Sequence, residues 1–156
     1  MATVPSRKPR IFVDADVLFA GAAGPSQHGA SLVILRMAEI TLVEAVCSRQ
    51  IVVEAERNLA QKLPEALPAF RLLVSRCLLI VPDPLLADLA PYAGLVDAED
   101  LPILVAALRE GCSWLITFNE RHCRPGHSRV TVLRPGEFLL RVRELLAHLS
   151  RLDVEP

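Results

Sequence analysis

Short apolar segments alternate with longer helical segments along the whole chain, and prolines and glycines separate one segment from the next. This order is typical of an α/β domain with a mainly parallel central sheet between two layers of helices, a three-layer α/β/α architecture. In such a domain the functional site lies beyond the carboxyl ends of the strands. We expect strands at residues 10–13, 41–47, 77–81, 113–117 and 129–133.

The segments between these strands carry helix signals. Ser48 stands where an N-cap is favoured, ahead of a helix that runs to about residue 62. Acidic residues and Pro102 suit the first turn of a helix at 101–110. The stretches 21–29 and 119–128 are expected to be loops. Further helices are predicted at 29–38, at 64–76 as one helix or a pair, at 85–90 and at 135–150.

Length and composition indicate one domain. The chain has 156 residues, so we treat 1–156 as a single unit with a basic arm at 1–9. Its net charge of -1 means that any binding to nucleic acid must use a local patch. The mean hydropathy of +0.37 raises the question of a membrane. The longest apolar stretches, however, are far shorter than the ~20 residues of a spanning helix. The surplus of Leu, Val and Ala therefore indicates a sheet buried on both faces and a self-association surface.

The cysteines favour a reducing compartment. Cys47, Cys77, Cys112 and Cys123 form no Cys-x-x-Cys pair, and no secretory signal precedes them. We therefore expect reduced core thiols in a cytoplasmic protein. A zinc site is not favoured, because no standard ligand spacing is matched by Cys112, His122, Cys123 and His127.

Three acidic residues stand where this topology predicts a site. Asp14 ends the first strand, Glu54 lies in the helix after the second, and Asp100 begins the helix before the fourth. Clustered carboxylates repel one another, and their oxygens are suitable ligands for Mg²⁺ or Mn²⁺. Taken singly, each acid also has a plain structural explanation as a turn cap, a solvated helix residue or an N-terminal cap.

The segments around these acids carry a further pattern. Residues 11–19 read IFVDADVLF, and residues 48–54 read SRQIVVE. Next come DAEDLPILVAAL at 97–108 and WLITFN at 114–119, and PGEFL follows at 135–139. Taken in this order over nearly the whole chain, these segments resemble the PIN (PilT N-terminus) domain family of metal-dependent ribonucleases. No single segment is specific, but the ordered set is.

The resemblance implies metal ligation by Asp14, Glu54 and Asp100, with Mg²⁺ or Mn²⁺ as the cofactor. Thr117 and Asn119 would support the site by orienting ligands, water or the scissile phosphate. The implied reaction is hydrolysis of an RNA phosphodiester by metal-activated water. Many small bacterial members are toxins silenced by an antitoxin, and many are homodimers. The expected partners are therefore an RNA substrate, an antitoxin protein and a second copy of the chain.

One position departs from the family pattern. A fourth acid often follows the asparagine by three residues, and here that place holds His122. An imidazole is a softer, neutral ligand, so activity would be weakened, shifted toward Mn²⁺ or lost. Asp97 and Glu99 lie beside the third acid and add negative charge, and Asp16 stands where the family commonly has asparagine. We count Asp16, Asp97 and His122 as further candidate metal ligands.

Two other functions remain open. Residues 14–18 (DADVL) also resemble the nucleophile motif of haloacid dehalogenase-like phosphatases. That superfamily needs a lysine late in the chain, whereas the lysines here are Lys8 and Lys62. The second alternative is a PIN fold with an eroded site that acts as an RNA- or protein-binding module. The histidine at the fourth acidic position favours the module, and the three retained acids favour the enzyme.

Basic and aromatic residues near the predicted site have two explanations each. Trp114 and Phe118 fit a buried strand, so we expect both in the core rather than stacked on bases. Four arginines surround the loop that would border the site, where they either grip RNA phosphates or are simply solvated. They are Arg121, Arg124, Arg129 and Arg134.

Overall fold

A computed structural model describes residues 8–24 and 29–152 of the chain. Apart from its last two residues, the basic arm expected at 1–9 lies outside the described residues. The strands form one parallel sheet in the order β3-β2-β1-β4-β5. The predicted three-layer α/β/α fold with a parallel sheet is confirmed. The strands are β1 (Arg10–Val13), β2 (Glu44–Ser48), β3 (Leu78–Val81), β4 (Trp114–Ile116) and β5 (Thr131–Leu133).

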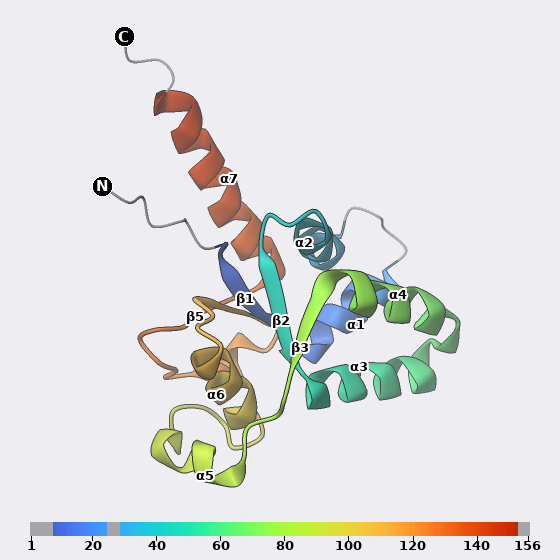
Figure 1. The fold of residues 1–156 in the computed structure, drawn as a ribbon, viewed down its shortest axis with the longest axis vertical. Coiled ribbons are helices and arrows are strands. Elements are labelled where there is room, and N and C mark those ends of the chain that lie inside the picture. Colours follow the sequence, from blue (N-terminus) through green and yellow to red (C-terminus); the bar gives the residue numbers. More distant parts are fainter. Residues whose placement is uncertain (1–7, 25–28, 153–156) are drawn as a thin grey trace.

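Helices cover both faces of this sheet (Figure 1). Helices α1 to α4 pack against one another on one side, and α5 and α6 lie on the other. Helix α7 packs against α2 and then extends away from the body of the molecule. The helices are α1 (Ala15–Ala23), α2 (Ala30–Glu39), α3 (Arg49–Lys62), α4 (Leu67–Cys77), α5 (Leu86–Leu89), α6 (Leu101–Arg109) and α7 (Pro135–Leu152). Short 3₁₀ turns lie at η1 (Pro64–Ala66), η2 (Ala90–Tyr92) and η3 (Glu120–Cys123).

Helix α1 corrects the prediction of a loop that begins at residue 21. The residues after β1 form a helix that continues through Gly21 to Ala23. Gly21 is buried, and a Cβ atom built on it would lie 2.7 Å from Cδ1 of Leu35 in α2. The glycine therefore allows two helices to approach closely and does not form a turn. Residues 25–28 of the predicted loop lie outside the described part of the chain.

The start of β2 also differs from the prediction. The strand begins at Glu44 instead of residue 41, because the chain first has to leave α2. Thr41 adopts a left-handed φ of 69°, and the backbone N–H of Leu42 donates to the carbonyl of Met37. Thr41 and Leu42, which were expected to begin the strand, instead close the helix.

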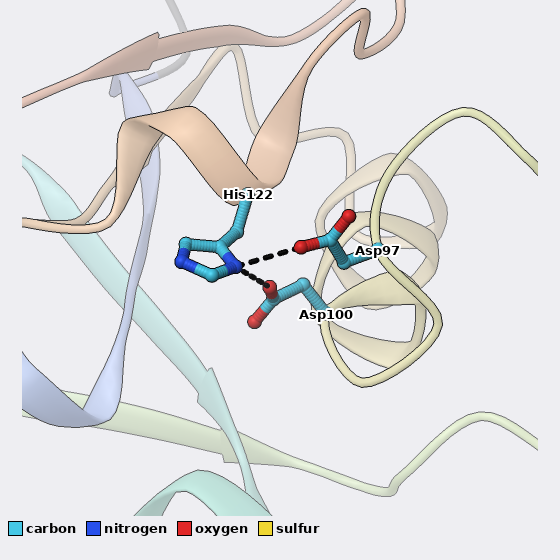
Figure 2. A group of neighbouring side chains, drawn as sticks. All are labelled: Asp97, Asp100 and His122. Carbon is cyan, nitrogen blue, oxygen red and sulfur yellow. Dashed lines mark hydrogen bonds and ion pairs between the residues drawn. The ribbon is translucent and has the colours of Figure 1, made fainter.

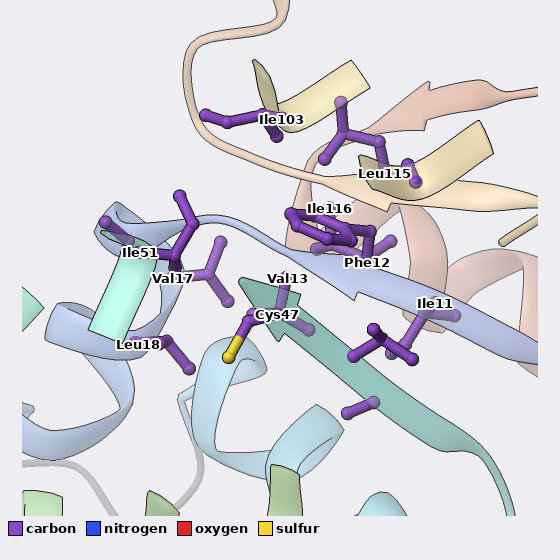
Figure 3. Packing of buried hydrophobic residues seen from close by; sticks show 14 of the residues in the cluster. Ile11, Phe12, Val13, Val17, Leu18, Cys47, Ile51, Ile103, Leu115 and Ile116 are labelled. Carbon is purple, nitrogen blue, oxygen red and sulfur yellow. The ribbon is translucent and has the colours of Figure 1, made fainter. Parts of the chain in front are cut away.

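The core is built around the central strand β1. Ile11, Phe12 and Val13 are fully buried, and Figure 3 shows them packed among apolar side chains from β2, β4 and neighbouring helices. Phe12 pairs with Val46 of β2 on one side and with Leu115 of β4 on the other. This packing holds the ends of the three central strands in fixed positions. The cysteines are free and buried, as predicted.

The surface carries exposed apolar side chains on α7. Leu145, Leu146 and Leu149 are each more than half exposed. None of the described helices, α7 included, has the combination of length and apolar composition that crossing a bilayer requires.

Candidate metal centre

Three segments bring acidic side chains to the carboxyl edge of the sheet. Strands β1 and β4 are neighbours whose chain connections lead to opposite sides, which is where α/β domains form their sites. The residues after β1, the first turns of α3 and the start of α6 meet at this point and line a cavity of about 160 Å³. The lining residues are Asp14, Asp16, Gln50, Glu54, Glu99, Asp100, Ile103 and Asn119.

Asp14 is buried and held through both carboxylate oxygens. Its Oδ1 accepts a 2.7 Å hydrogen bond from the backbone N–H of Ala15, which caps α1. Its Oδ2 accepts a 2.8 Å hydrogen bond from the hydroxyl of Thr117. The Thr117 oxygen accepts in turn from the backbone N–H of Asn119 at 3.1 Å. Each carboxylate oxygen has two lone pairs, so capping a helix and ligating a cation are compatible for Asp14.

One carboxylate oxygen of Asp16 is buried without a partner among the described residues. Its Oδ2 accepts hydrogen bonds from the backbone N–H of Phe118 at 3.0 Å and from the Thr117 hydroxyl at 3.4 Å. Its Oδ1 is buried and has no hydrogen-bond partner among the described residues. A buried carboxylate oxygen in this state costs free energy unless a cation or a proton satisfies it.

Burial, together with the charge of Asp14, raises the pKa of the acids around the cavity. Burial and the nearby Asp14 raise the pKa of Asp16 to about 6. Burial also raises the pKa of Asp14, against two hydrogen bonds that lower it. Burial and the charge of Asp14 raise the pKa of Glu54 and of Asp100. Because these carboxyl groups resist ionisation, a divalent cation among them would relieve a repulsion that the fold itself imposes.

Beside the cavity, an imidazole joins two carboxylates (Figure 2). Nδ1 of His122 lies 2.7 Å from Oδ2 of Asp97 and 4.0 Å from Oδ2 of Asp100. The backbone N–H of Asp97 donates to the carbonyl of His122, which holds η3 against the turn before α6. One candidate ligand atom from each residue lies within 4.8 Å of the other two. Asp100 also lines the cavity, so it is common to both groups.

Most of the predicted site residues therefore meet. Thr117 contacts the cavity through Asp14, and Asp97 and His122 stand at its side through Asp100. The side chain of Asp100 makes no capping hydrogen bond, although the residue stands at the N-cap of α6. The hydrogen bond expected of a helix cap is therefore absent, which argues against Asp100 serving only as a cap. The predicted site residues that line the cavity are Asp14, Asp16, Glu54, Asp100 and Asn119, and Glu99, which was expected to add negative charge beside Asp100, lines it too.

Gln50 and Ile103 were missed by the sequence reasoning. Gln50 precedes Glu54 by one helical turn, and Ile103 follows Asp100 by three residues, so helical spacing identifies both as neighbours of an acid. The prediction that Ser48 caps α3 is right about position but not about the contact. The Ser48 side chain makes no capping bond, and Asp83 instead accepts from the backbone N–H of Gln50 at 2.9 Å.

Phe118 corrects the prediction that both aromatic residues lie in the core. Strand β4 ends at Ile116, so the Phe118 side chain is 38% exposed. Trp114 packs against the core as predicted, with its ring 6.0 Å from that of Phe138. The four arginines near the loop are exposed, and Arg129 lines a different pocket beside α5 and α6.

Comparison with protein families identifies the domain. A PIN domain model matches residues 10–121, a range that covers most of the chain and every residue lining the acidic cavity. The chain belongs to the PIN domain family. The resemblance carried by the segments around the acids is therefore confirmed. No curated protein matches the sequence of this PIN domain significantly.

Solved structures share the fold of this PIN domain. VapBC2 from Rickettsia felis, bound to a promoter DNA fragment, has a TM-score of 0.57 at 14% identity, over 80% of this chain and 98% of that chain. VapC20 from Mycobacterium tuberculosis, a sarcin-ricin loop cleaving toxin, has a TM-score of 0.55 at 17% identity, over 77% and 98%. PAE2754 from Pyrobaculum aerophilum has a TM-score of 0.62 at 18% identity, over 87% and 96%. At these identities the likeness establishes the fold.

Proposed function

We propose that this PIN domain is a metal-dependent endoribonuclease that uses Mg²⁺ or Mn²⁺. The observation that carries the proposal is a cavity lined by carboxylates, in which Oδ1 of Asp16 is buried without a hydrogen-bond partner among the described residues. Such a set of oxygens fits a hard divalent cation, whose charge would offset the repulsion. The lining residues include no basic side chain that could do so instead.

The residues of the cavity divide into ligands and positioning groups. When bound, the ion would polarise a phosphoryl oxygen and lower the pKa of an attacking water. The hydroxyl of Thr117 fixes the orientation of Asp14. The side-chain amide of Asn119, which lines the cavity, can hydrogen-bond a water or a phosphate oxygen. The carboxylates that would hold the ion are those of Asp14, Asp16, Glu54 and Asp100.

The partners belong to the same proposal. Membership of the PIN family and the fold shared with VapC20, a sarcin-ricin loop cleaving toxin, support RNA as the substrate. The fold shared with VapBC2 supports a toxin role with an antitoxin partner. The exposed leucines of α7 support a homodimer.

The alternatives differ in what they need from the site. The phosphatase alternative needs a lysine at the site, and no described lysine lines the cavity. Nζ of Lys62, the last residue of α3, lies over the ring of Phe19 on α1. The binding-module alternative rests on His122, which pairs with Asp97 and does not line the cavity. The cavity nevertheless has five carboxylates in its lining, so the charge that attracts a cation is retained without an acid at position 122.

Calorimetric titration with Mn²⁺ and Mg²⁺ tests the proposal on the wild-type protein and on Asp14→Asn. We expect saturable binding by the wild type, and at least about 10–100-fold weaker binding by the variant. Cleavage of a single-stranded RNA, measured in parallel, should fall with metal binding. Glu65→Gln is the matched control, because Glu65 is an exposed acid on η1, outside the cavity lining.

The opposite result would decide for the binding module. A well-folded wild-type protein that binds neither ion and cleaves no RNA would overturn the enzyme. Cleavage that persists unchanged in Asp14→Asn would instead overturn the assigned site.

A further inference from the structure

A basic stripe runs along one face of α3, next to the acidic cavity. Arg49, Val53 and Arg57 are spaced four residues apart, so they stand in one row, and all three are exposed. With 1.5 Å of rise per residue, the two arginines lie about 12 Å apart along the helix. They line an open groove of about 480 Å³ together with Gln50, Glu54 and Asp83.

The groove is continuous with the candidate metal centre. Gln50 and Glu54 line both the groove and the acidic cavity. Both residues stand on the first two turns of α3, so the two surfaces share one stretch of helix. A polymer bound at the cavity can therefore continue along α3. The first turn of this helix lies at the carboxyl edge of the sheet (Figure 1).

The guanidinium groups of this stripe are available to a ligand. Among the described residues, neither Arg49 nor Arg57 makes a hydrogen bond or a salt bridge, whereas Arg71 of α4 is paired with Glu56. The groove also holds two acids, Glu54 and Asp83, and neither forms a salt bridge with these arginines among the described residues; Oδ1 of Asp83 accepts the backbone N–H of Gln50 instead. A guanidinium presents planar donors that match two phosphate oxygens at once.

We propose that Arg49 and Arg57 form a phosphate-binding subsite that holds the RNA backbone on the α3 side of the metal centre. The inference rests on the proposed ribonuclease function and names the surface that recognises its substrate. The cavity carboxylates repel a phosphodiester, so RNA needs positive charge on at least one flank to approach them. Val53, between the two arginines, offers an apolar contact to a sugar or a base.

The test measures RNA binding apart from cleavage. A labelled single-stranded RNA is titrated by fluorescence anisotropy at several NaCl concentrations, in an Asp14→Asn background that suppresses cleavage. We expect Arg49→Gln with Arg57→Gln to weaken affinity about tenfold and to reduce the slope of log K against log salt by about 1.4, which is about 0.7 per lost contact for a single strand. Glutamine keeps helix propensity, so α3 should remain folded.

The control is Arg141→Gln with Arg143→Gln, which removes the same charge from exposed positions on α7. The RNA affinity and the salt slope of this control should match those of the Asp14→Asn parent protein. If the α3 variant also matched the parent, the subsite would be overturned, while Mn²⁺ binding by the wild type would still stand. If the Asp14→Asn parent bound no RNA, both the subsite and the RNA substrate would be overturned.

A poly-glutamate peptide, titrated in the same way, tests a different occupant. If the α3 variant kept its RNA binding but lost its binding of this peptide, the RNA subsite would be overturned and an acidic protein segment would be identified as the occupant.

Discussion

A single hydroxyl group orients Asp14. Thr117 is fully buried, and its oxygen donates to Asp14 and accepts from the backbone of Asn119. Valine has the same shape but leaves both partners unpaired. We expect Thr117→Val to lower the free energy of unfolding by about 1–3 kcal/mol. It should also weaken Mn²⁺ binding about 10–100-fold, as loss of a ligand's hydrogen-bond partner does.

Urea unfolding and calorimetry measure these two effects. Thr117→Ser keeps the hydroxyl and should retain metal affinity close to that of the wild type. Unchanged metal affinity in Thr117→Val would show that the hydroxyl does not position Asp14.

Without divalent ions, ionisation of Asp16 should destabilise the protein. Its pKa in the folded state is about 6, above the ordinary value of 3.8, so the folded protein holds this proton more tightly than the unfolded chain. The resulting stability is present below about pH 4 and is lost as the pH rises through about 6. We expect the free energy of unfolding to fall by about 1–2 kcal/mol over this window, after allowance for solvent screening.

Urea unfolding of chelator-treated protein from pH 4 to 7.5 checks this expectation. Asp16→Asn removes the titrating group, so its stability should vary less with pH. Added Mn²⁺ should restore stability at the upper end, since cations bind the ionised carboxylates. A wild-type stability that rises with pH after chelation would contradict the assignment.

The identity of the acids could be predicted from the sequence, but their hydrogen-bond partners could not. Asp14, Glu54 and Asp100 follow recognisable strand and helix boundaries, so the topology places them at one edge of the sheet. The orientation of the Asp16 carboxylate, which leaves Oδ1 unpaired among the described residues, depends on the hydrogen bond from Phe118 to Oδ2. Phe118 lies 102 residues away, and the pairing of β1 with β4 brings it close. Such a contact leaves no mark on local sequence pattern.

Element boundaries decide which side chains reach the site. The apolar run before Asn119 suggested that β4 includes residue 117 and that Phe118 is in the core. The strand stops one residue earlier, and this turns the Phe118 amide toward Asp16. The helix through Gly21 escaped prediction for a related reason. Glycine commonly marks a turn, and only the contact with Leu35 reveals that it serves helix packing.

The turn before α6 and η3 form one coupled unit through His122. Replacing the imidazole by a carboxylate would set a third acid against Asp97 and Asp100. We expect His122→Asp to destabilise the ion-free protein and to strengthen Mg²⁺ binding about tenfold, because affinity for hard cations rises with the number of charged ligands. Calorimetry with both ions should show the preference for Mn²⁺ over Mg²⁺ decreasing.

His122→Asn provides the comparison, since it removes the imidazole without adding charge. If both variants bind Mg²⁺ as the wild type does, position 122 takes no part in the metal centre. If His122→Asn alone loses Mn²⁺ binding, the imidazole is itself a ligand.

At the scale of the molecule, the parallel sheet could be predicted because strands and helices alternate along the chain. The order β3-β2-β1-β4-β5 is set by how the helical crossovers pack, and the alternation alone does not specify it. That order makes β1 the central strand and places its carboxyl end beside that of β4. Asp14 therefore follows directly after the central strand, whose last three residues are fully buried.

The extended helix α7 should join two copies of the chain. Leu145, Leu146 and Leu149 are exposed on it at helical spacing, which is unusual for a surface without a partner. We expect the wild type to be a dimer and Leu146→Glu with Leu149→Glu to be a monomer, by size-exclusion chromatography with light scattering. Leu86→Glu on α5 is the control, because Leu86 is 87% exposed and should leave the dimer intact. A dimer that survives the α7 substitutions would place the interface elsewhere.

The acidic cavity also links the lifetime of the folded chain to its supply of divalent ions. An ion that binds only the folded state stabilises it by about 2.7 kcal/mol at a concentration of 100 times Kd. Repulsion among the cavity carboxylates acts against the ion-free state. A protease that attacks the transiently unfolded chain would therefore degrade the protein faster when Mg²⁺ and Mn²⁺ are scarce. Ion supply would then set how long the molecule persists, independently of any reaction that it catalyses.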